Sequence, residues 1–461
     1  MRILKIAFLT ACCLLLSACS SFQLSLTDLM QAPKLSEDQA EIYEALTGAV
    51  GSPDIQLKYP RKGGYRSAFV MFDLDEDEEE EALVFYNVPS WGTNVRIMVL
   101  DHQGEQWVSV YDAVGEGTDV TEADFRILTG SGRHCMLIGW EQGTSENTKM
   151  SVYDYVDGQF RVLFESEYSQ MLIEDIDGDK VEEILLGIFK ASSKTGSIRL
   201  INETGEGLQS VSRVVMGSTI TEFLGIEIGQ LAPDRTAVFV DAYTGNDRVV
   251  TEIMVYTEDG RLRSLDGPYG NLDRQLVREI PVRCEDIDRD GIFEVPVLLS
   301  EPEEDEREEE DNQKNMVQYL NLSNPQELEA FSIAGPEEDL QEELAYFQFA
   351  PVWTGFVNLD YGFRFQFPKE WIGQVEVIKE SGRNEWVFAL RSDTAEPTAL
   401  LRIRVYGLDE PRDVFDNVTY ERLEKRGVYE YCAALVKAPN VPDLFRLDWE
   451  TVQEYFSTLK S

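Results

Sequence analysis

Acidic residues recur at a fixed spacing in three short stretches of the chain. In "DIDGDKVEE", which runs from 175 to 183, they stand at positions 1, 3, 5 and 9. The stretches "DLDEDEEEE" (73–81) and "DIDRDGIFE" (286–294) are acidic at the same four positions. Because the pattern occurs three times, it indicates one recurring local structure. Its twelve residues are Asp73, Asp75, Asp77, Glu81, Asp175, Asp177, Asp179, Glu183, Asp286, Asp288, Asp290 and Glu294.

Carboxylates at alternate positions of a tight loop point their oxygen atoms toward a common centre. Held within a few ångströms of one another, they repel unless a cation neutralises them. Ca²⁺ is a hard cation that takes several oxygen ligands in flexible geometry. An EF-hand would place a glutamate at position 12, but Val84, Leu186 and Val297 stand there. The pattern therefore predicts Ca²⁺ sites that are not EF-hands; the alternative is three solvated acidic turns without an ion.

Each acidic stretch leads into an apolar run that is typical of a buried strand. Such runs start about 50 residues apart, and each is followed by a hairpin with a polar tip. A four-stranded sheet of this size cannot bury both faces alone, so such units pack side by side around an axis. The repeats predict a mainly β fold with a β-propeller of at least five blades over 65–335. The five runs are "EALVFY" from Glu81, "CMLIGW" from Cys135, "EILLGIF" from Glu183, "TAVFVDA" from Thr236 and "EVPVLL" from Glu294.

A nine-residue pattern D-x-D-x-D-x-x-x-[DE] before a propeller strand resembles the FG-GAP/VCBS repeats of integrin-type propellers. The resemblance covers about 65–335 and implies Ca²⁺ ligands at the four acidic positions of each loop. Family loops favour glycine at positions 4 and 6, where this chain has Gly178 in the third unit and Gly291 in the fifth. The second and fourth units have "TGSGRHC" and "GQLAPDR" in place of the carboxylates, so we expect them to fold without a metal.

The N-terminal stretch "MRILKIAFLTACCLLLSACS" has a basic start and a short apolar run, as secretory signals have. Its residues Leu16-Ser17-Ala18-Cys19 resemble the lipobox of bacterial lipoproteins. The resemblance implies cleavage before Cys19 and a diacylglycerol on its thiol, which would anchor the chain to a membrane of the bacterial envelope, outside the cytoplasm. We expect a signal peptide over 1–19, then a tether and a lead-in helix over 20–64. The helix begins at Ser36, where "SEDQ" has the form of a capping box.

After residue 335 the pattern predicts a smaller α+β domain with an antiparallel sheet over 336–461. Phe363, Phe365 and Phe367 alternate with polar residues, which predicts one buried face of a strand. Helices are expected just after 336, over 412–425 and at the C-terminal end, where Trp449, Val452, Phe456 and Leu459 share one side. The opening "YGFRFQFPKEW" resembles the PsbP/Mog1-like α/β sandwich. In the preceding unit, the acidic run at 301–311 is predicted to be a solvated, mobile hairpin insertion; the alternative is a polyanionic recognition loop.

The composition bounds the partners and the chemistry of the exported part. A formal charge of -44 argues against nucleic acid as a partner, because two polyanions repel. Cys135, Cys284 and Cys432 are widely spaced and odd in number, so we expect buried thiols rather than a disulfide framework. His102 and His134 stand beside no nucleophile signature.

These features favour a cell-surface binding protein over an enzyme. We expect its partner to be a protein or a glycan, and its membrane attachment to run through the lipid on Cys19. The alternative function is that of an envelope enzyme acting on polysaccharide, with the propeller as its scaffold. Such an enzyme would need two carboxyl groups facing each other across a cleft.

Overall fold

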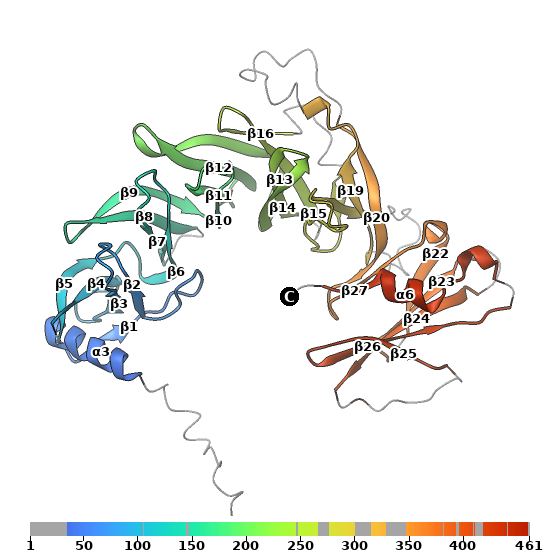
Figure 1. The fold of residues 1–461 in the computed structure, drawn as a ribbon, viewed down its shortest axis with the longest axis horizontal. Coiled ribbons are helices and arrows are strands. Elements are labelled where there is room, and N and C mark those ends of the chain that lie inside the picture. The colour runs from blue at the N-terminus through green and yellow to red at the C-terminus, as the bar shows by residue number, and fades with distance from the viewer. Residues whose placement is uncertain are drawn as a thin grey trace, which may run out of the picture. The chain divides into compact units, whose positions relative to one another are not determined.

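The computed structural model describes most of the chain after residue 34 (Figure 1). Several predicted features lie outside the described residues: the signal peptide with Cys19, the start of the tether, the acidic run at 301–311 and most of the helix expected after 336. The described residues are 35–104, 106–143, 147–245, 248–265, 276–299, 315–328, 347–380, 382–392, 396–408, 410, 418–439 and 441–459.

The fold is mainly β, with several antiparallel sheets. The chain divides into two compact units. The first consists of residues up to 123 together with 155–160, and the second of residues 124–154 together with 161 onward. In the described part of the chain, no helix is both long enough and apolar enough to cross a bilayer.

The first unit contains one helix and one sheet. Helix α3 (Glu37–Val50) begins with the predicted capping box, in which the Ser36 and Gln39 side chains each accept the other's backbone N–H. Its Ile42 and Leu46 are buried in one apolar cluster with strand residues such as Val84. The sheet order is β1-β3-β4-β5, and β2 pairs with β3. The strands are β1 (Gln56–Leu57), β2 (Phe69–Phe72), β3 (Glu81–Asn87), β4 (Arg96–Gln103) and β5 (Gln106–Val114).

Two further sheets carry the second, third and fourth repeats. The second repeat is a four-stranded sheet in the order β6-β7-β8-β9, and the next sheet runs from β10 to β16 in chain order, with β17 paired to β15. Strand β13 (Gly207–Ala232) pairs with β12 along its first half and with β14 along its second half. The third and fourth repeats therefore share one long strand. The other strands are β6 (Asp119–Arg126), β7 (Cys135–Glu141), β8 (Thr148–Val156), β9 (Gln159–Tyr168), β10 (Gln170–Glu174), β11 (Glu183–Lys190), β12 (Thr195–Thr204), β14 (Arg235–Thr244), β15 (Val249–Tyr256), β16 (Leu262–Ser264) and β17 (Val277–Arg278).

The C-terminal part contains two five-stranded sheets, in the orders β18-β19-β20-β21-β27 and β22-β23-β24-β26-β25. The predicted domain boundary at 335/336 stays a prediction; the strands on either side of it, β19 and β20, are hydrogen-bonded in one sheet. The elements are β18 (Val295–Leu298), β19 (Met316–Leu322), β20 (Phe349–Asn358), β21 (Phe363–Gln366), η4 (Lys369–Trp371), β22 (Val375–Lys379), β23 (Glu385–Leu390), β24 (Thr398–Gly407), β25 (Glu421–Arg426), β26 (Tyr429–Leu435), η5 (Asp443–Phe445), α6 (Trp449–Tyr455) and β27 (Phe456–Thr458).

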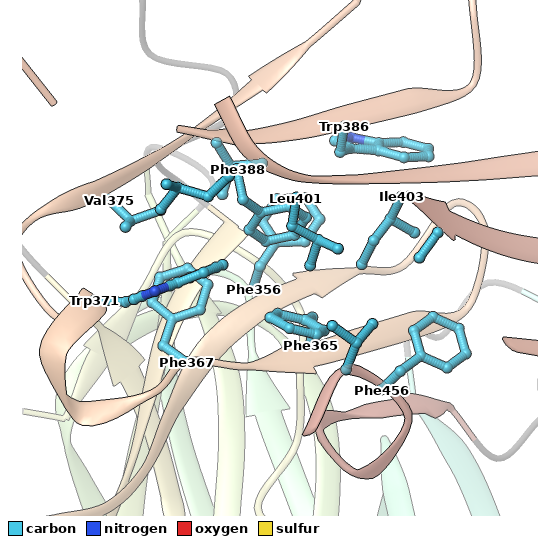
Figure 2. Close-up of a cluster of buried hydrophobic side chains, with 14 of the residues drawn as sticks. Phe356, Phe365, Phe367, Trp371, Val375, Trp386, Phe388, Leu401, Ile403 and Phe456 are labelled. Atoms are coloured by element: carbon cyan, nitrogen blue, oxygen red, sulfur yellow. The ribbon is translucent and has the colours of Figure 1, made fainter. Parts of the chain in front are cut away.

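The predicted aromatic face of 363–367 is confirmed as core. Phe363 and Phe365 are fully buried, and Phe367 is 4% exposed. Figure 2 shows Phe365 and Phe367 among Trp371, Phe388 and other members of this cluster. The prediction that Cys135, Cys284 and Cys432 are buried free thiols is also confirmed.

The helix predicted over 412–425 is wrong in its described part, and the predicted C-terminal helix is confirmed only over Trp449–Tyr455. Residues 421–425 lie in β25 and pair with β26, because Gly427, at φ 56°, makes a tight hairpin turn between the two strands. At the C-terminal end, α6 stops at Tyr455, and Phe456 starts β27 instead of continuing the helix. Pairing of Phe456 with Phe365 places both rings in the core, which favours the strand there.

Candidate metal sites

Each acidic stretch is a turn between two antiparallel partners. The residue just before the loop pairs with the loop's ninth residue in all three cases: Phe72 with Glu81, Glu174 with Glu183, and Glu285 with Glu294. The first two loops join β2 to β3 and β10 to β11, and the third leads into β18. Backbone pairing thus fixes both ends of every loop, through sheet strands in the first two loops and an isolated bridge in the third.

The backbone is left-handed at positions 4 and 6 of all three loops. These residues are Glu76 and Glu78, Gly178 and Lys180, and Arg289 and Gly291, with φ between 66° and 92°. Four of the six are not glycine, although a side chain makes this conformation unfavourable. The glycine preference expected at these positions therefore follows from their left-handed backbone conformation, which glycine adopts without strain.

This backbone shape turns consecutive N–H groups toward the first aspartate of the loop. In 175–183, Asp175 accepts hydrogen bonds from the N–H groups of Gly178, Asp179 and Lys180 at 2.7–3.1 Å. Position 1 accepts from positions 5 and 6 in the other two loops as well. The first carboxylate is thus held by the loop's own backbone.

Three carboxylates in each loop bring their oxygen atoms within 4.8 Å of one another. Of the four acidic positions predicted as ligands, the structure places positions 1, 3 and 9 together in the first two loops, and positions 1, 3 and 5 in the third. The three clusters are Asp73, Asp75 and Glu81; Asp175, Asp177 and Glu183; and Asp286, Asp288 and Asp290. Among the described residues, such groups occur at no other place.

The remaining predicted ligands lie outside these clusters. Asp77 and Asp179, at position 5, accept the N–H of position 7 at 2.9 and 2.7 Å. Glu294, at position 9 of the third loop, is completely buried. All twelve predicted residues therefore lie in the three loops, but each compact cluster contains three carboxylates rather than four.

The glutamate at position 9 is buried in every loop, with exposures of 3% for Glu81, 1% for Glu183 and 0% for Glu294. Its Oε2 accepts the N–H of position 2 at 2.6–2.9 Å. Burial, followed by repulsion from the loop aspartates, raises the pKa of each of these carboxyls to about 7, while the backbone N–H opposes the shift. In Glu183 and Glu294, Oε1 is buried and has no hydrogen-bond partner.

An unpartnered buried carboxylate oxygen is costly, and a bound cation would remove the cost. The donor sets contain carboxylate oxygens alone, without nitrogen or sulfur, which fits a hard cation. The acidic clusters could therefore hold a metal ion. The turns of the second and fourth repeats differ: Gly130 donates to the distant Glu203 at 2.6 Å, and a tight turn at Asp234 joins β13 to β14.

Sequence reasoning missed a tyrosine beside one cluster. The Tyr256 hydroxyl, at the end of β15, donates to Asp177 Oδ2 at 3.2 Å. A signal for it was present, because Tyr155 and Tyr256 stand at matching places in the hairpins "YDYVDGQF" and "MVYTEDGRL", each shortly before a glycine.

No family model matches the chain, and no curated protein matches it. Among solved structures, the chain is similar to the crystal structure of exotype rhamnogalacturonan lyase YesX, with 12% sequence identity and a TM-score of 0.21. The match covers 43% of this chain and 55% of the lyase chain, so the chain spans about half the length of that protein. A likeness at this TM-score carries no argument about fold or activity.

Proposed function

We propose that the three acidic loops bind Ca²⁺ and that the chain is a lipid-anchored, cell-surface binding protein. The observation that carries the metal proposal is the Glu183 carboxylate, which is buried beside Asp175 and Asp177 with one oxygen unpartnered. Extracellular Ca²⁺ modules bind with Kd values of about 10⁻⁴ to 10⁻³ M. Such affinities suit ions that stay bound outside the cell and stabilise the fold.

The repeats that carry the loops form, in this proposal, an FG-GAP/VCBS-like propeller. Two facts support it. Each acidic loop enters a strand that starts in the core: β3 is buried along its length, β11 over its first six residues and β18 over its first three. The three loops also share their backbone conformation, their hydrogen bonds and their pairing across the loop. One local structure that recurs in successive sheets is what a family of repeats produces.

Attachment to the membrane is proposed through a diacylglycerol on Cys19. Cys19→Ser tests it: the variant protein should leave the membrane fraction or retain its signal peptide. Equal membrane attachment of the variant and the parent would contradict the anchor. Ser20→Ala is the matched control, because it changes the adjacent residue and leaves the thiol in place.

The proposed partner is a protein or a glycan at the cell surface. The charge of -44 disfavours nucleic acid and favours a basic or neutral surface. A pull-down with the fragment that lacks residues 1–19, with Ca²⁺ or with a chelator, tests this class. Capture of a defined protein or glycan in Ca²⁺ supports the proposal, and hydrolysis of a bound polysaccharide would favour the enzyme alternative.

A further inference from the structure

The loop at 175–183 is hydrogen-bonded to the repeat that precedes it. The N–H of Glu182, at position 8, donates to the carbonyl of Ile127 at 2.8 Å. The Glu182 side chain accepts from Arg126 Nη1 at 3.0 Å. Position 8 of the third loop makes the same kind of contact, because Phe293 N–H donates to the Gln230 carbonyl at 2.8 Å.

The same loop is also hydrogen-bonded to the repeat that follows it. Tyr256 stands at the end of β15, where the hairpin to β16 begins, and its hydroxyl donates to Asp177 Oδ2. Burial, followed by the nearby Asp177, raises the pKa of Tyr256. Gly260 of the same hairpin approaches this hydroxyl closely, since a Cβ built on it would lie 3.7 Å away.

A matching tyrosine occurs beside the first loop. Burial, followed by the carboxylates of Glu81 and Asp75, raises the pKa of Tyr155 to about 12. A Cβ built on Gly158 would lie 4.0 Å from the Tyr155 hydroxyl, and the corresponding distance from Gly260 to the Tyr256 hydroxyl is 3.7 Å. Two repeats therefore each carry a tyrosine and, a few residues later, a glycine near the tyrosine hydroxyl.

We propose that Tyr256 is a positioning residue of the cation site at 175–183, and that a bound cation couples the β15–β16 hairpin to this loop. The inference rests on the proposed function, because it needs a cation at the loop. The hydroxyl fixes one oxygen of Asp177, a member of the cluster. A cation would neutralise the cluster and keep Asp177 in place as an acceptor for Tyr256. Binding in one repeat thus strengthens the contact with the next.

Tb³⁺ luminescence tests this arrangement in the full chain, purified in detergent. Tb³⁺ occupies oxygen-lined Ca²⁺ sites, and its emission is sensitised by an excited tyrosine that lies close by. The other two clusters are first weakened by Asp75→Asn and Asp288→Asn, so that most of the signal comes from 175–183. In this background, Tyr256→Phe should lose most of the tyrosine-sensitised emission while Tb³⁺ uptake, measured by equilibrium dialysis, persists.

Tyr243→Phe is the matched control. Strands β14 and β15 pair from Ala237 and Val255 at one end to Tyr243 and Val249 at the other. Tyr256 directly follows Val255, at the end near the loop, so Tyr243 lies at the opposite end of the two strands. The control should keep its emission. Hydrogen exchange gives a second measurement: Ca²⁺ should slow exchange in β15 and β16 of the parent chain, and this protection should be lost in Tyr256→Phe.

The outcomes separate this inference from the proposed function. Tb³⁺ uptake with unchanged sensitised emission in Tyr256→Phe would overturn the role of Tyr256. Ca²⁺-dependent protection of β15 and β16 that is equal in the parent and in Tyr256→Phe would overturn the coupling. If the parent chain takes up no Tb³⁺ and no Ca²⁺, the metal proposal fails, and the inference fails with it.

Discussion

The backbone N–H of Ile176 donates to Glu183 Oε2 at 2.8 Å, which links positions 2 and 9 of the acidic loop. Ile176 is 7% exposed and belongs to the apolar cluster beneath the loop, so its side chain and its N–H both hold the loop to the sheet. The other Glu183 oxygen is left without a partner. One carboxylate therefore closes the loop and offers an oxygen to a cation.

Glu183→Gln should separate the two roles of this carboxylate. Without Ca²⁺, we expect little change in Tm, because the buried acid with its raised pKa is replaced by a neutral side chain of the same shape. With Ca²⁺, the variant should lose part of the stabilisation that the parent gains, since a negatively charged ligand is missing. Calorimetry with and without Ca²⁺ measures both effects. Glu206→Gln, at an exposed residue, is the control, and an equal Ca²⁺ gain in parent and variant would exclude Glu183 as a ligand.

The left-handed positions of the same loop predict opposite effects of two substitutions. Lys180 has φ 76°, so Lys180→Gly should relieve backbone strain and raise the free energy of unfolding by about 0.5–1 kcal/mol. Gly178 has φ 82° and open space around its Cβ position, so Gly178→Ala should lower it by about 1 kcal/mol through strain alone. Urea denaturation in chelator compares both with the parent. A loss of stability in Lys180→Gly would contradict this account of the loop.

The sequence predicted the loops and their strands because both are local features. The four acidic positions and the buried run from Glu183 lie within a few residues of each other. Both therefore act on the same short stretch of backbone, a turn that leads into a strand. The capping box at Ser36 was predictable for the same reason. Local pattern failed at 421–425. These residues favour a helix, but the turn at Gly427 that follows them pairs them with β26, and this pairing overrides their helix propensity.

Long-range features were not predictable from local pattern. The residues around Asp177 do not show that Tyr256, 79 residues away, would donate to it; the signal for this tyrosine lies in its own hairpin, which matches that of Tyr155. The third and fourth repeats were expected as separate sheets, but β13 runs through both, with irregular register near Thr195 and Ile220. Such sharing depends on how neighbouring strands pair in space, which the alternation of apolar residues does not encode.

A buried ion pair in the second unit predicts a large loss of stability on truncation. Asp241 and Arg278 approach to 2.8 Å, and both side chains are fully buried. Asp241→Ala leaves the guanidinium without its partner and should cost about 3–5 kcal/mol of unfolding free energy. The control is Asp443→Ala at an exposed pair with Arg446, where at most about 1 kcal/mol is expected. Similar losses in the two variants would show that Asp241 is not buried as described.

The cysteines predict both slow chemistry and a pH dependence. Burial raises the pKa of Cys135 to about 11 and that of Cys284 well above its usual value. In the folded fragment that lacks residues 1–19, a disulfide reagent should therefore react very slowly at neutral pH, and three thiols should react after denaturation.

The pH dependence follows from the same shifts. The unfolded chain releases its thiol protons near pH 8.5, before the folded chain does, so stability should fall as the pH rises above about 8.5. Urea titrations across this range measure the slope. Rapid reaction of all three thiols in the folded state, or stability that rises with pH in this range, would contradict their burial.

The most direct test of the central claim is the effect of Ca²⁺ on the thermal unfolding of the fragment that lacks residues 1–19. At about 10 mM Ca²⁺, roughly ten to one hundred times the Kd range of extracellular Ca²⁺ modules, each occupied site should add about 1.4–2.7 kcal/mol. The parent fragment should therefore melt at a higher temperature in millimolar Ca²⁺ than in chelator. A variant with Asp75→Asn, Asp177→Asn and Asp288→Asn, one change in each cluster, should show little of this increase. An unchanged Tm of the parent in millimolar Ca²⁺, or an equal increase in the variant, would contradict the claim that these loops are Ca²⁺ sites.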